Sequence, residues 1–154
     1  MLYDIPTSSI YGSVYEGEAE NNNVHGYGVF KLASGSVYRG NYYLNRRVGY
    51  AYYLYSKKAK GLSYEGNYFD SMFSGFGKLT FKTNEAYEGN FVRNRQNGYG
   101  VYYYNNDDVY RGNWKNGKID GFGSMDYGNG DRYEGQWVRG KKRGFGYNYT
   151  ASSK

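Results

Sequence analysis

Residues 110–123 read YRGNWKNGKIDGFG, and this stretch decides how the chain folds. Residues 133–146 read YEGQWVRGKKRGFG, so the same pattern returns 23 residues later. A Tyr-[Glu/Arg]-Gly triplet opens six such stretches, at Tyr15, Tyr38, Tyr64, Tyr87, Tyr110 and Tyr133. A second signature, Gly-[Tyr/Phe]-Gly, begins 11 residues after each tyrosine and departs in the second stretch, which reads Gly-Tyr-Ala at residues 49–51. Two signatures held in phase indicate a protein of six repeats.

Composition narrows the class of protein. The chain has 154 residues, enough for one modest domain, with 24 Gly, 23 Tyr and a net charge of +6. Its aromatic content is too high for a disordered chain. The lack of cysteine excludes disulfides and thiolate chemistry, and the single His25 excludes a multi-histidine metal centre. No apolar run approaches the roughly 18 residues of a membrane span, and the first residues lack the features of a signal peptide. We therefore expect a cytoplasmic protein.

Each repeat has the pattern of a β-hairpin. Counted from the tyrosine as position 0, positions 0, 2 and 4 read Tyr, Gly and aromatic, and polar residues alternate with them, which is typical of a strand with one packed face. Positions 5 to 10 are polar and turn-like, as in residues 115–120, and positions 11 to 17 form a second strand, as in residues 98–104. Short loops such as residues 128–131 make the next strand an antiparallel neighbour.

The glycines suggest how the two strands of a hairpin pair. We expect position 4 opposite position 11 and position 2 opposite position 13, so that an aromatic ring faces one glycine and two glycines face each other. Repeated glycine in a strand marks tight curvature or close backbone approach, and a ring over a cross-strand glycine shields the exposed backbone. The face that carries positions 0, 2, 4, 11, 13 and 15 is then narrow, aromatic and concave.

The predicted fold class is all-β: an elongated single-layer antiparallel sheet of six stacked β-hairpins, which forms a solenoid-like rod. At roughly 4.8 Å per strand, twelve strands extend about 55 to 60 Å. The repeats are expected over residues 15–150, starting near 15, 38, 64, 87, 110 and 133. Residues 1–14 are interpreted as an N-terminal cap or partial repeat, with or without a strand, and residues 151–154 as a tail.

The units at residues 110–123 and 133–146 closely resemble the MORN repeat (membrane occupation and recognition nexus), and the resemblance extends over roughly residues 11–150. It implies a non-catalytic rod of stacked hairpins that serves as a scaffold in cytoskeletal, ciliary or cell-division assemblies, or as a tether near membranes. The first two repeats depart from the pattern, through Ala19, through Ala51 and through three extra residues around 56–61. We expect a bent or capping N-terminal end there.

Two surfaces are candidates for binding. The first is an aromatic groove formed by the rings at position 4, where exposed rows would receive a helix or an extended segment of a protein partner. Its predicted residues are Tyr42, Tyr68, Phe91, Trp114 and Trp137. Packing between neighbouring repeats is the alternative interpretation of each ring.

The second candidate is a basic edge made by the hairpin turns, which line one side of the rod when the hairpins stack in register. Its residues are Arg46, Arg47, Arg93, Arg95, Lys115, Lys118, Arg139, Lys141, Lys142 and Arg143. The third repeat, with Asp70 in its turn, interrupts the row. Such an edge can hold anionic lipid headgroups or an acidic protein, or can simply keep the sheet soluble. Nucleic acid is disfavoured, because the net charge is modest and no recognition helix is visible.

Enzymatic chemistry finds no support in the pattern. Position 1 carries Glu in four repeats but Arg39 and Arg111 in two, which fits cross-strand charge pairing and not an acid–base pair. Residues 135–141 match most of a phosphate-binding loop, but Lys142 stands where Ser or Thr is required, and no helix follows. We therefore expect no catalytic residue, no metal site and no cofactor.

The leading hypothesis is a non-enzymatic scaffold that binds protein partners along the aromatic groove as a subunit of a larger assembly, cytoskeletal, ciliary or near a membrane. The alternative is a peripheral membrane module that binds anionic phospholipids through the basic edge. Pairing of the end strands between two copies, to give a homodimer, is also left open.

Overall fold

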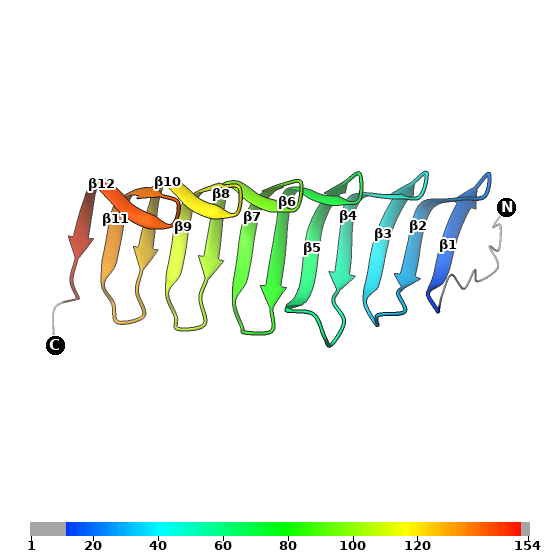
Figure 1. Cartoon of the computed structure of the whole chain (residues 1–154), viewed down its shortest axis with the longest axis horizontal. Helices are drawn as coiled ribbons and strands as arrows, with labels where there is room; N and C mark the ends of the chain where they lie inside the picture. The colour runs from blue at the N-terminus through cyan, green and yellow to red at the C-terminus, as the bar shows by residue number, and fades with distance from the viewer. Residues whose placement is uncertain (1–11, 152–154) are drawn as a thin grey trace.

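The computed structural model describes residues 12–151, which form one open sheet of twelve antiparallel strands in sequence order (Figure 1). This confirms the predicted fold class. The strands are β1 (Val14–Glu20), β2 (Asn23–Lys31), β3 (Val37–Tyr43), β4 (Arg46–Leu54), β5 (Gly61–Phe69), β6 (Met72–Phe81), β7 (Ala86–Val92), β8 (Arg95–Tyr103), β9 (Val109–Lys115), β10 (Lys118–Asp126), β11 (Arg132–Val138) and β12 (Lys141–Tyr149). The interpretation of residues 1–14 falls largely outside the described residues.

The turn inside each hairpin is tighter than the sequence pattern indicates. Positions 6 and 7 have positive φ in all six repeats, for example Leu44 at 46° and Asn45 at 66°. Two central residues of this kind define a two-residue hairpin turn whose twist matches that of the flanking strands. The strands therefore continue to position 5 and resume at position 8, and the prediction of a turn over positions 5 to 10 is corrected.

The register within a hairpin confirms one pairing and corrects the other. Position 2 lies opposite position 13, as in Gly89 and Gly100. Position 4, however, lies opposite position 9, as in Phe91 and Gln96, because positions 11 and 12 form a bulge. Position 11 is a glycine with φ between 64° and 109° in every repeat, a conformation that a side chain would strain.

The predicted pairing of an aromatic residue at position 4 with the glycine at position 11 does occur, but between repeats. Gly98 of the fourth repeat lies opposite Trp114 of the fifth, and the other junctions repeat this pairing. The asparagine at position 3 supports the bulge: Asn113 Nδ2 donates to the carbonyl of Phe122 at 3.1 Å, and Asn67 makes the same bond to Phe76 at 3.2 Å. The bulge thus shifts the pairing of positions 4 and 11 from one hairpin to the junction with the next.

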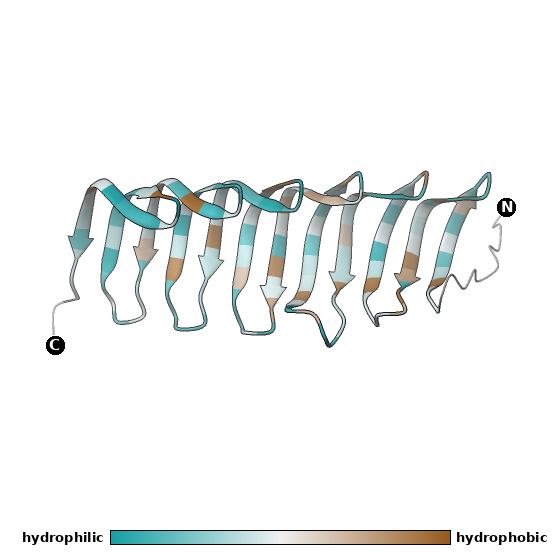
Figure 2. Ribbon diagram, viewed as in Figure 1, coloured by the Kyte–Doolittle hydropathy of each residue, from teal (hydrophilic) through white to brown (hydrophobic). Residues whose placement is uncertain are grey.

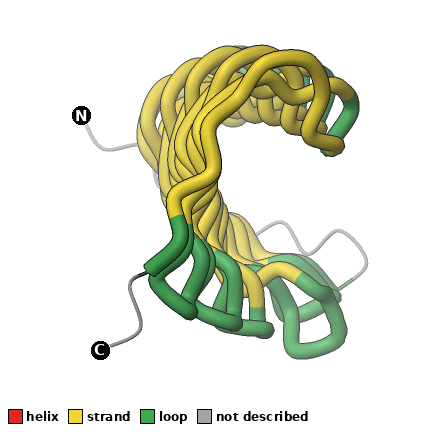
Figure 3. Tube along the Cα trace, turned by 90° about the vertical axis from the view of Figure 1, so that its left-hand side faces the viewer, coloured by secondary structure: helices red, strands yellow, loops and turns green. Residues whose placement is uncertain are grey.

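The sheet is bent into a C in cross-section (Figure 3), and the concave face opens toward the viewer of Figure 1. The paired glycines at positions 2 and 13 lie under the tyrosine at position 0. A Cβ built on Gly100 would lie 2.4 Å from the hydroxyl of Tyr87, so a side chain there requires the tyrosine ring to shift. The Tyr87 ring lies across both glycines, and its hydroxyl donates a hydrogen bond to the carbonyl of Asn90 at 2.9 Å. The same bond is present in all six repeats.

The core is a zigzag of aromatic rings along the concave face. Each ring at position 4 contacts the tyrosine of its own repeat and that of the preceding one edge to face, as Trp114 does with Tyr110 and Tyr87 at 5.6 and 5.1 Å between ring centroids. Such aromatic pairs stabilise the fold in addition to the stabilisation that comes from burying the rings. The strands show little strongly apolar colour in Figure 2, since tyrosine counts as fairly polar on that scale although its ring fills this core.

The hairpin turns are also tied together along the rod. The N–H at position 7 of each repeat donates to the carbonyl at position 9 of the preceding repeat, at 2.8 to 3.1 Å. At the opposite edge, the extra residues of the second repeat lie in the loop 55–60. Lys82 Nζ holds that loop by donating to the carbonyls of Ser56, Lys57 and Ala59. The insertion therefore lies mainly in a loop: β4 and β5 pair regularly beside it, and the β5–β6 pairing is irregular between Gly61 and Ser63.

Candidate binding surfaces

The five rings predicted to line an open groove are buried. Their exposed fractions lie between 1% for Phe91 and 7% for Tyr42 and Trp114. They are covered by the neighbouring core tyrosines and by side chains at positions 9 and 15, such as Phe73 against Tyr68 and Tyr102 against Trp114. The expectation of an open row at position 4 is therefore corrected, and a direct binding role for these rings stays a prediction. The indole N–H groups of Trp114 and Trp137 also donate hydrogen bonds to the carbonyls of Gly100 and Gly123, respectively.

A second set of rings stands above this core, on the same concave face. Position 15 lies opposite position 0, as in Tyr53 opposite Tyr38 and Tyr102 opposite Tyr87. We call the half-buried rings at positions 15 and 17 the concave wall. It comprises Phe30, Tyr53, Tyr55, Phe81, Tyr102, Tyr104 and Tyr127. Position 15 was predicted on this face, but the wall residues were not among the predicted site residues. Their aromatic character at a fixed period is the signal that points to them.

Burial has a chemical consequence for the concave wall. Desolvation raises the pKa of Tyr55 and of Tyr102 to about 12, and it also raises the pKa of Tyr104. These hydroxyls are neutral at physiological pH, as tyrosine already is at its ordinary pKa near 10, and burial keeps them neutral to higher pH. They are hydrogen-bond donors and acceptors on a largely aromatic surface, which is the combination that favours Tyr in binding sites.

The convex face has an aromatic row that sequence analysis missed. The central residue of each Gly-[Tyr/Phe]-Gly signature, at position 12, points away from the core. These residues are Tyr27, Tyr50, Phe76, Tyr99, Phe122 and Phe145, with exposed fractions from 54% to 89%. The last three contribute to a depression of about 660 Å³ over β8 to β12, together with Arg111 and Glu134. The glycines of the signature predict curvature or close backbone approach, and they give no indication that the ring between them is exposed.

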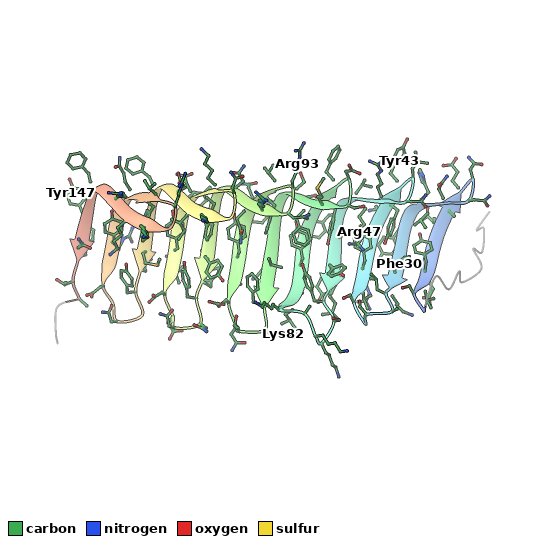
Figure 4. All side chains as sticks on the ribbon, viewed as in Figure 1. Phe30, Tyr43, Arg47, Lys82, Arg93 and Tyr147 are labelled. Atoms are coloured by element: carbon green, nitrogen blue, oxygen red, sulfur yellow. The ribbon has the colours of Figure 1, made fainter. Side chains whose placement is uncertain are left out.

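The structure divides the predicted basic edge. Arg47 and Lys142, at position 9, turn onto the concave face, where the Arg47 guanidinium lies 4.9 Å from the Tyr38 ring centroid and Lys142 Nζ lies 4.4 Å from that of Tyr133. Figure 4 shows Arg47 and Phe30 in front of the ribbons, whereas Arg93 and Tyr43 project from the turns. Cation–π contacts of this kind are an alternative to solvent for a charged group.

The remaining eight predicted cations lie at or beside the hairpin turns and are exposed. Arg46 is the one member of the predicted edge that forms an ion pair with a described residue, Asp70 of the next repeat, at 2.5 Å. From β8 to β12 the turn edge is therefore positive without a matching carboxylate in ion-pair contact. Asp120 approaches it, but its carboxylate accepts the backbone N–H of Arg139 at 3.1 Å.

The described residues show neither a helix long and apolar enough to cross a membrane nor a group of three or more His, Asp or Glu side chains that could hold a metal ion.

An open sheet of stacked hairpins with a single aromatic core defines a β-hairpin solenoid. The family model of the MORN repeat matches residues 15–37, 64–85, 87–109, 110–132 and 133–147. The chain belongs to the MORN repeat family, whose members are generally scaffolds for interaction with proteins or membranes. The second repeat, residues 38–63, lies outside these matches, and it is the repeat that carries Ala51 and the longer loop.

Among solved structures, the chain is similar to the TCP domain of SAS-4 (dCPAP) of Drosophila melanogaster, solved in complex with a proline-rich motif of Ana2 (dSTIL). The two are 14% identical with a TM-score of 0.44, over 91% of this chain and 79% of that chain. No curated protein matches the chain.

Proposed function

We propose that this protein is a non-catalytic scaffold that binds a protein partner along its concave face. The observation that carries the proposal is the concave wall, a row of half-buried rings with no second layer of described residues above it. Half-exposed tyrosines supply large rigid contact area at low entropic cost. In this proposal the five buried rings at position 4 support the wall from below.

The concave face suits a partner that is elongated. The wall repeats once per hairpin, about every 10 Å at two strands per repeat, and it continues over most of the rod. A helix or an extended segment lying along the rod contacts several rings at once, whereas a compact partner reaches few of them. The scaffold role expected for the family is consistent with this surface.

The test compares the two aromatic faces. Tyr53→Ser with Tyr102→Ser alters the concave wall, and Tyr27→Ser with Tyr99→Ser is the matched control, since it removes two tyrosines from the convex face. Each immobilised protein is used to capture partners from a cell extract, with quantitative mass spectrometry as the readout. We expect proteins that the wild type and the convex variant retain and the concave variant loses. Equal capture by all three, or loss with the convex variant alone, contradicts the proposal.

The turn edge favours a second candidate function, binding to anionic phospholipids. The supporting observation is the exposed run of cations over the last three repeats, without ion-pair partners among the described residues. Each Lys or Arg close to such a surface contributes about 1 kcal/mol of binding. This candidate needs no aromatic contact and is weakened by salt, since exposed charges are screened over about 10 Å at 0.1 M.

Liposome co-sedimentation tests this second candidate. The variant Lys115→Glu, Lys118→Glu, Arg139→Glu reverses the turn edge. Lys57→Glu, Lys58→Glu, Lys60→Glu is its control, with the same change of charge on the opposite edge. We expect binding to vesicles that contain phosphatidylserine, lost in about 0.5 M salt and in the turn-edge variant but kept by the control. Absence of binding at low salt rejects the candidate and leaves the protein-binding proposal unaffected.

A further inference from the structure

The two outermost strands of the described sheet carry opposite charges. β1 has three carboxylates, Glu16, Glu18 and Glu20, and no cation. β12 has three cations, Lys141, Lys142 and Arg143, and no carboxylate. No strand between them has three charges of one sign without any of the other. The rod is therefore electrically polar along its length.

β12 is also the most exposed strand of the sheet. All nine of its residues are exposed, and β11 is its one hydrogen-bonded neighbour among the described strands. Phe145, Tyr147 and Tyr149 are 89%, 73% and 52% exposed, although they occupy positions that neighbouring repeats partly cover elsewhere in the rod. An edge of this kind has unpaired N–H and C=O groups that can pair with another strand.

Every junction between repeats uses one register, and β12 and β1 have the residues to continue it. Position 13 pairs with position 2 of the next repeat, as in Gly123 with Gly135. Applied to β12 and to the β1 strand of a second copy, this register places Gly146 opposite Gly17, so that the glycine pairing is kept. The bend of the sheet can then pass from one copy to the next.

The turn contacts extend in the same way. Asn45, at position 7, donates its N–H to the Val24 carbonyl at 3.0 Å, and its side chain accepts the Val24 N–H at 2.8 Å. Asn22 has the same position in the first repeat, so the same register would place its groups beside Lys142 of a neighbouring copy.

The charges meet at this junction. Within the chain, position 10 of one repeat lies beside position 5 of the next, where the His25 and Tyr43 rings are 5.2 Å apart. At a junction between copies these two positions are occupied by Arg143 and Glu20. In this register Glu18 lies opposite Phe145 and Glu16 opposite Tyr147, so Arg143 and Glu20 are the one oppositely charged pair in direct reach.

We propose that this protein associates head to tail, with β12 of one copy pairing with β1 of a second copy to continue the sheet. Such a contact is heterologous and leaves one end of each type free, so it produces open chains of rods and not closed dimers. Charged residues on edge strands ordinarily prevent pairing. Here the like charges oppose pairing of β12 with a second β12 and of β1 with a second β1. The opposite charges of β12 and β1 favour pairing of these two strands.

One residue makes the junction weaker than those within the chain. Position 4 of the first repeat is Ala19, so the ring that fills the space between two consecutive core tyrosines elsewhere is missing. The association is therefore reversible and depends on charge. Ala19→Trp supplies the missing ring and is expected to lower the concentration at which chains form.

Sedimentation velocity over a range of concentrations tests the proposal with the full chain. The variants are Lys141→Glu with Arg143→Glu, which reverses β12 but keeps the stacked Lys142, and Glu18→Lys with Glu20→Lys, which reverses β1. Arg93→Glu with Arg95→Glu and Glu65→Lys with Glu88→Lys are the matched controls, with equal changes of net charge in the middle of the rod. Circular dichroism checks that each variant is folded.

We expect the average mass of the wild type to rise past that of a dimer with concentration and to fall at about 0.5 M salt. Each end-strand variant needs about tenfold more protein for half-assembly, whereas the controls match the wild type. An equimolar mixture of the two end-strand variants assembles again, because each acidic β12 then meets a basic β1 and each basic β12 an acidic β1.

Two outcomes overturn the proposal. A wild-type chain that stays monomeric at low salt shows that β1 and β12 do not pair. Assembly that stops at the dimer and is unchanged by the reversal of β1 identifies pairing of β12 with itself. Neither outcome bears on partner capture by the concave wall, so this proposal and the proposed function fail independently.

Discussion

Each repeat contains two aromatic residues twelve positions apart, and they have opposite fates. The tyrosine at position 0 is at most 4% exposed, whereas the ring at position 12 is at least 54% exposed. Tyr87 and Tyr99 show the contrast in a single hairpin, on adjacent strands and with the same side chain. Residue type therefore does not decide which ring is in the core.

The difference arises from the glycines around each ring. Tyr87 lies on the inside of the bend, where Gly89 and Gly100 leave space for its ring and where the carbonyl of Asn90 accepts its hydroxyl. Tyr99 lies in the bulge, after Gly98 with φ of 80°, and points to the convex face. A single-layer sheet can bury aromatic rings only where its backbone closes around them.

The largest expected effect is a loss of stability at alkaline pH, which arises from the buried tyrosines at position 0. Burial raises the pKa of Tyr15 to about 12 and raises those of Tyr38, Tyr64, Tyr87 and Tyr110 still further. In the unfolded chain these groups ionise near pH 10. The unfolded state then binds fewer protons than the folded one, so the free energy of unfolding falls as the pH rises above 10.

Each such tyrosine contributes a loss of about 1.4 kcal/mol per pH unit, and that stability is fully present below pH 10. We expect cooperative unfolding by about pH 12, followed by far-ultraviolet circular dichroism. Tyr87→Phe should reduce the slope of the unfolding free energy against pH by the contribution of one tyrosine, about 1.4 kcal/mol per pH unit. A free energy of unfolding that is constant between pH 9 and 12 contradicts the burial of the row.

Truncation of the two rings should separate them directly. Tyr87→Ala removes a fully buried ring and its hydrogen bond, and we expect a loss of about 3 to 5 kcal/mol. Tyr99→Ala removes an exposed ring, with an expected change within about 0.5 kcal/mol. Urea denaturation measures both. Similar values for the two variants are incompatible with the assignment of concave and convex faces.

The paired glycines at positions 2 and 13 should differ in how well they tolerate substitution by alanine. A Cβ on Gly89 would lie 2.5 Å from the Gly100 Cα and 2.7 Å from the Tyr99 carbonyl oxygen, both backbone atoms. On Gly100 the near atoms belong to the Tyr87 side chain, which can shift. Ala51 is a natural example of the second case: it is 3% exposed, and Tyr38 keeps its 2.9 Å bond to Asn41.

We therefore expect Gly89→Ala to cost about 2 to 3 kcal/mol and Gly100→Ala about 1 kcal/mol. Thermal and urea denaturation of the two variants provide the comparison. If Gly100→Ala is the more damaging change, the second repeat is not a guide to the others.

The smallest expected effect concerns one hydroxyl in the core. The Tyr68 side chain is buried, and its hydroxyl has no hydrogen-bond partner among the described residues. Tyr68→Phe should stabilise the protein by up to about 1 kcal/mol, because an unsatisfied buried group is removed. Tyr64→Phe is the control and should cost about 1 kcal/mol, since its hydroxyl bonds the Asn67 carbonyl at 2.9 Å. A loss of stability in Tyr68→Phe would indicate that the hydroxyl is satisfied.

Much of this architecture could be predicted from the sequence, because the determining signals are local and periodic. The phase of Tyr-[Glu/Arg]-Gly against Gly-[Tyr/Phe]-Gly gives the repeat, and alternation over positions 0 to 4 gives the strand and its packed face. The pairing of positions 2 and 13 also follows, since glycines at both leave few alternatives.

The binding surfaces were harder to predict. Trp114 and its equivalents were expected in an open groove, since an exposed ring and a buried ring are the same letter in a sequence. The concave wall at positions 15 and 17 and the row at position 12 follow from where the backbone bends and bulges. The opposite charges of β1 and β12 are visible in the sequence, but their significance depends on the position of the two strands at the two ends of the described sheet.

The sequence by itself determined the period, the hairpins, the antiparallel order and the aromatic composition of one face. The tertiary structure alone decided that position 4 pairs with position 9 inside the hairpin and with position 11 of the preceding repeat. The physical reason is that alternation reports which face a side chain takes within its own strand. The register between strands depends instead on a left-handed glycine at position 11 and on neighbours that are distant in sequence.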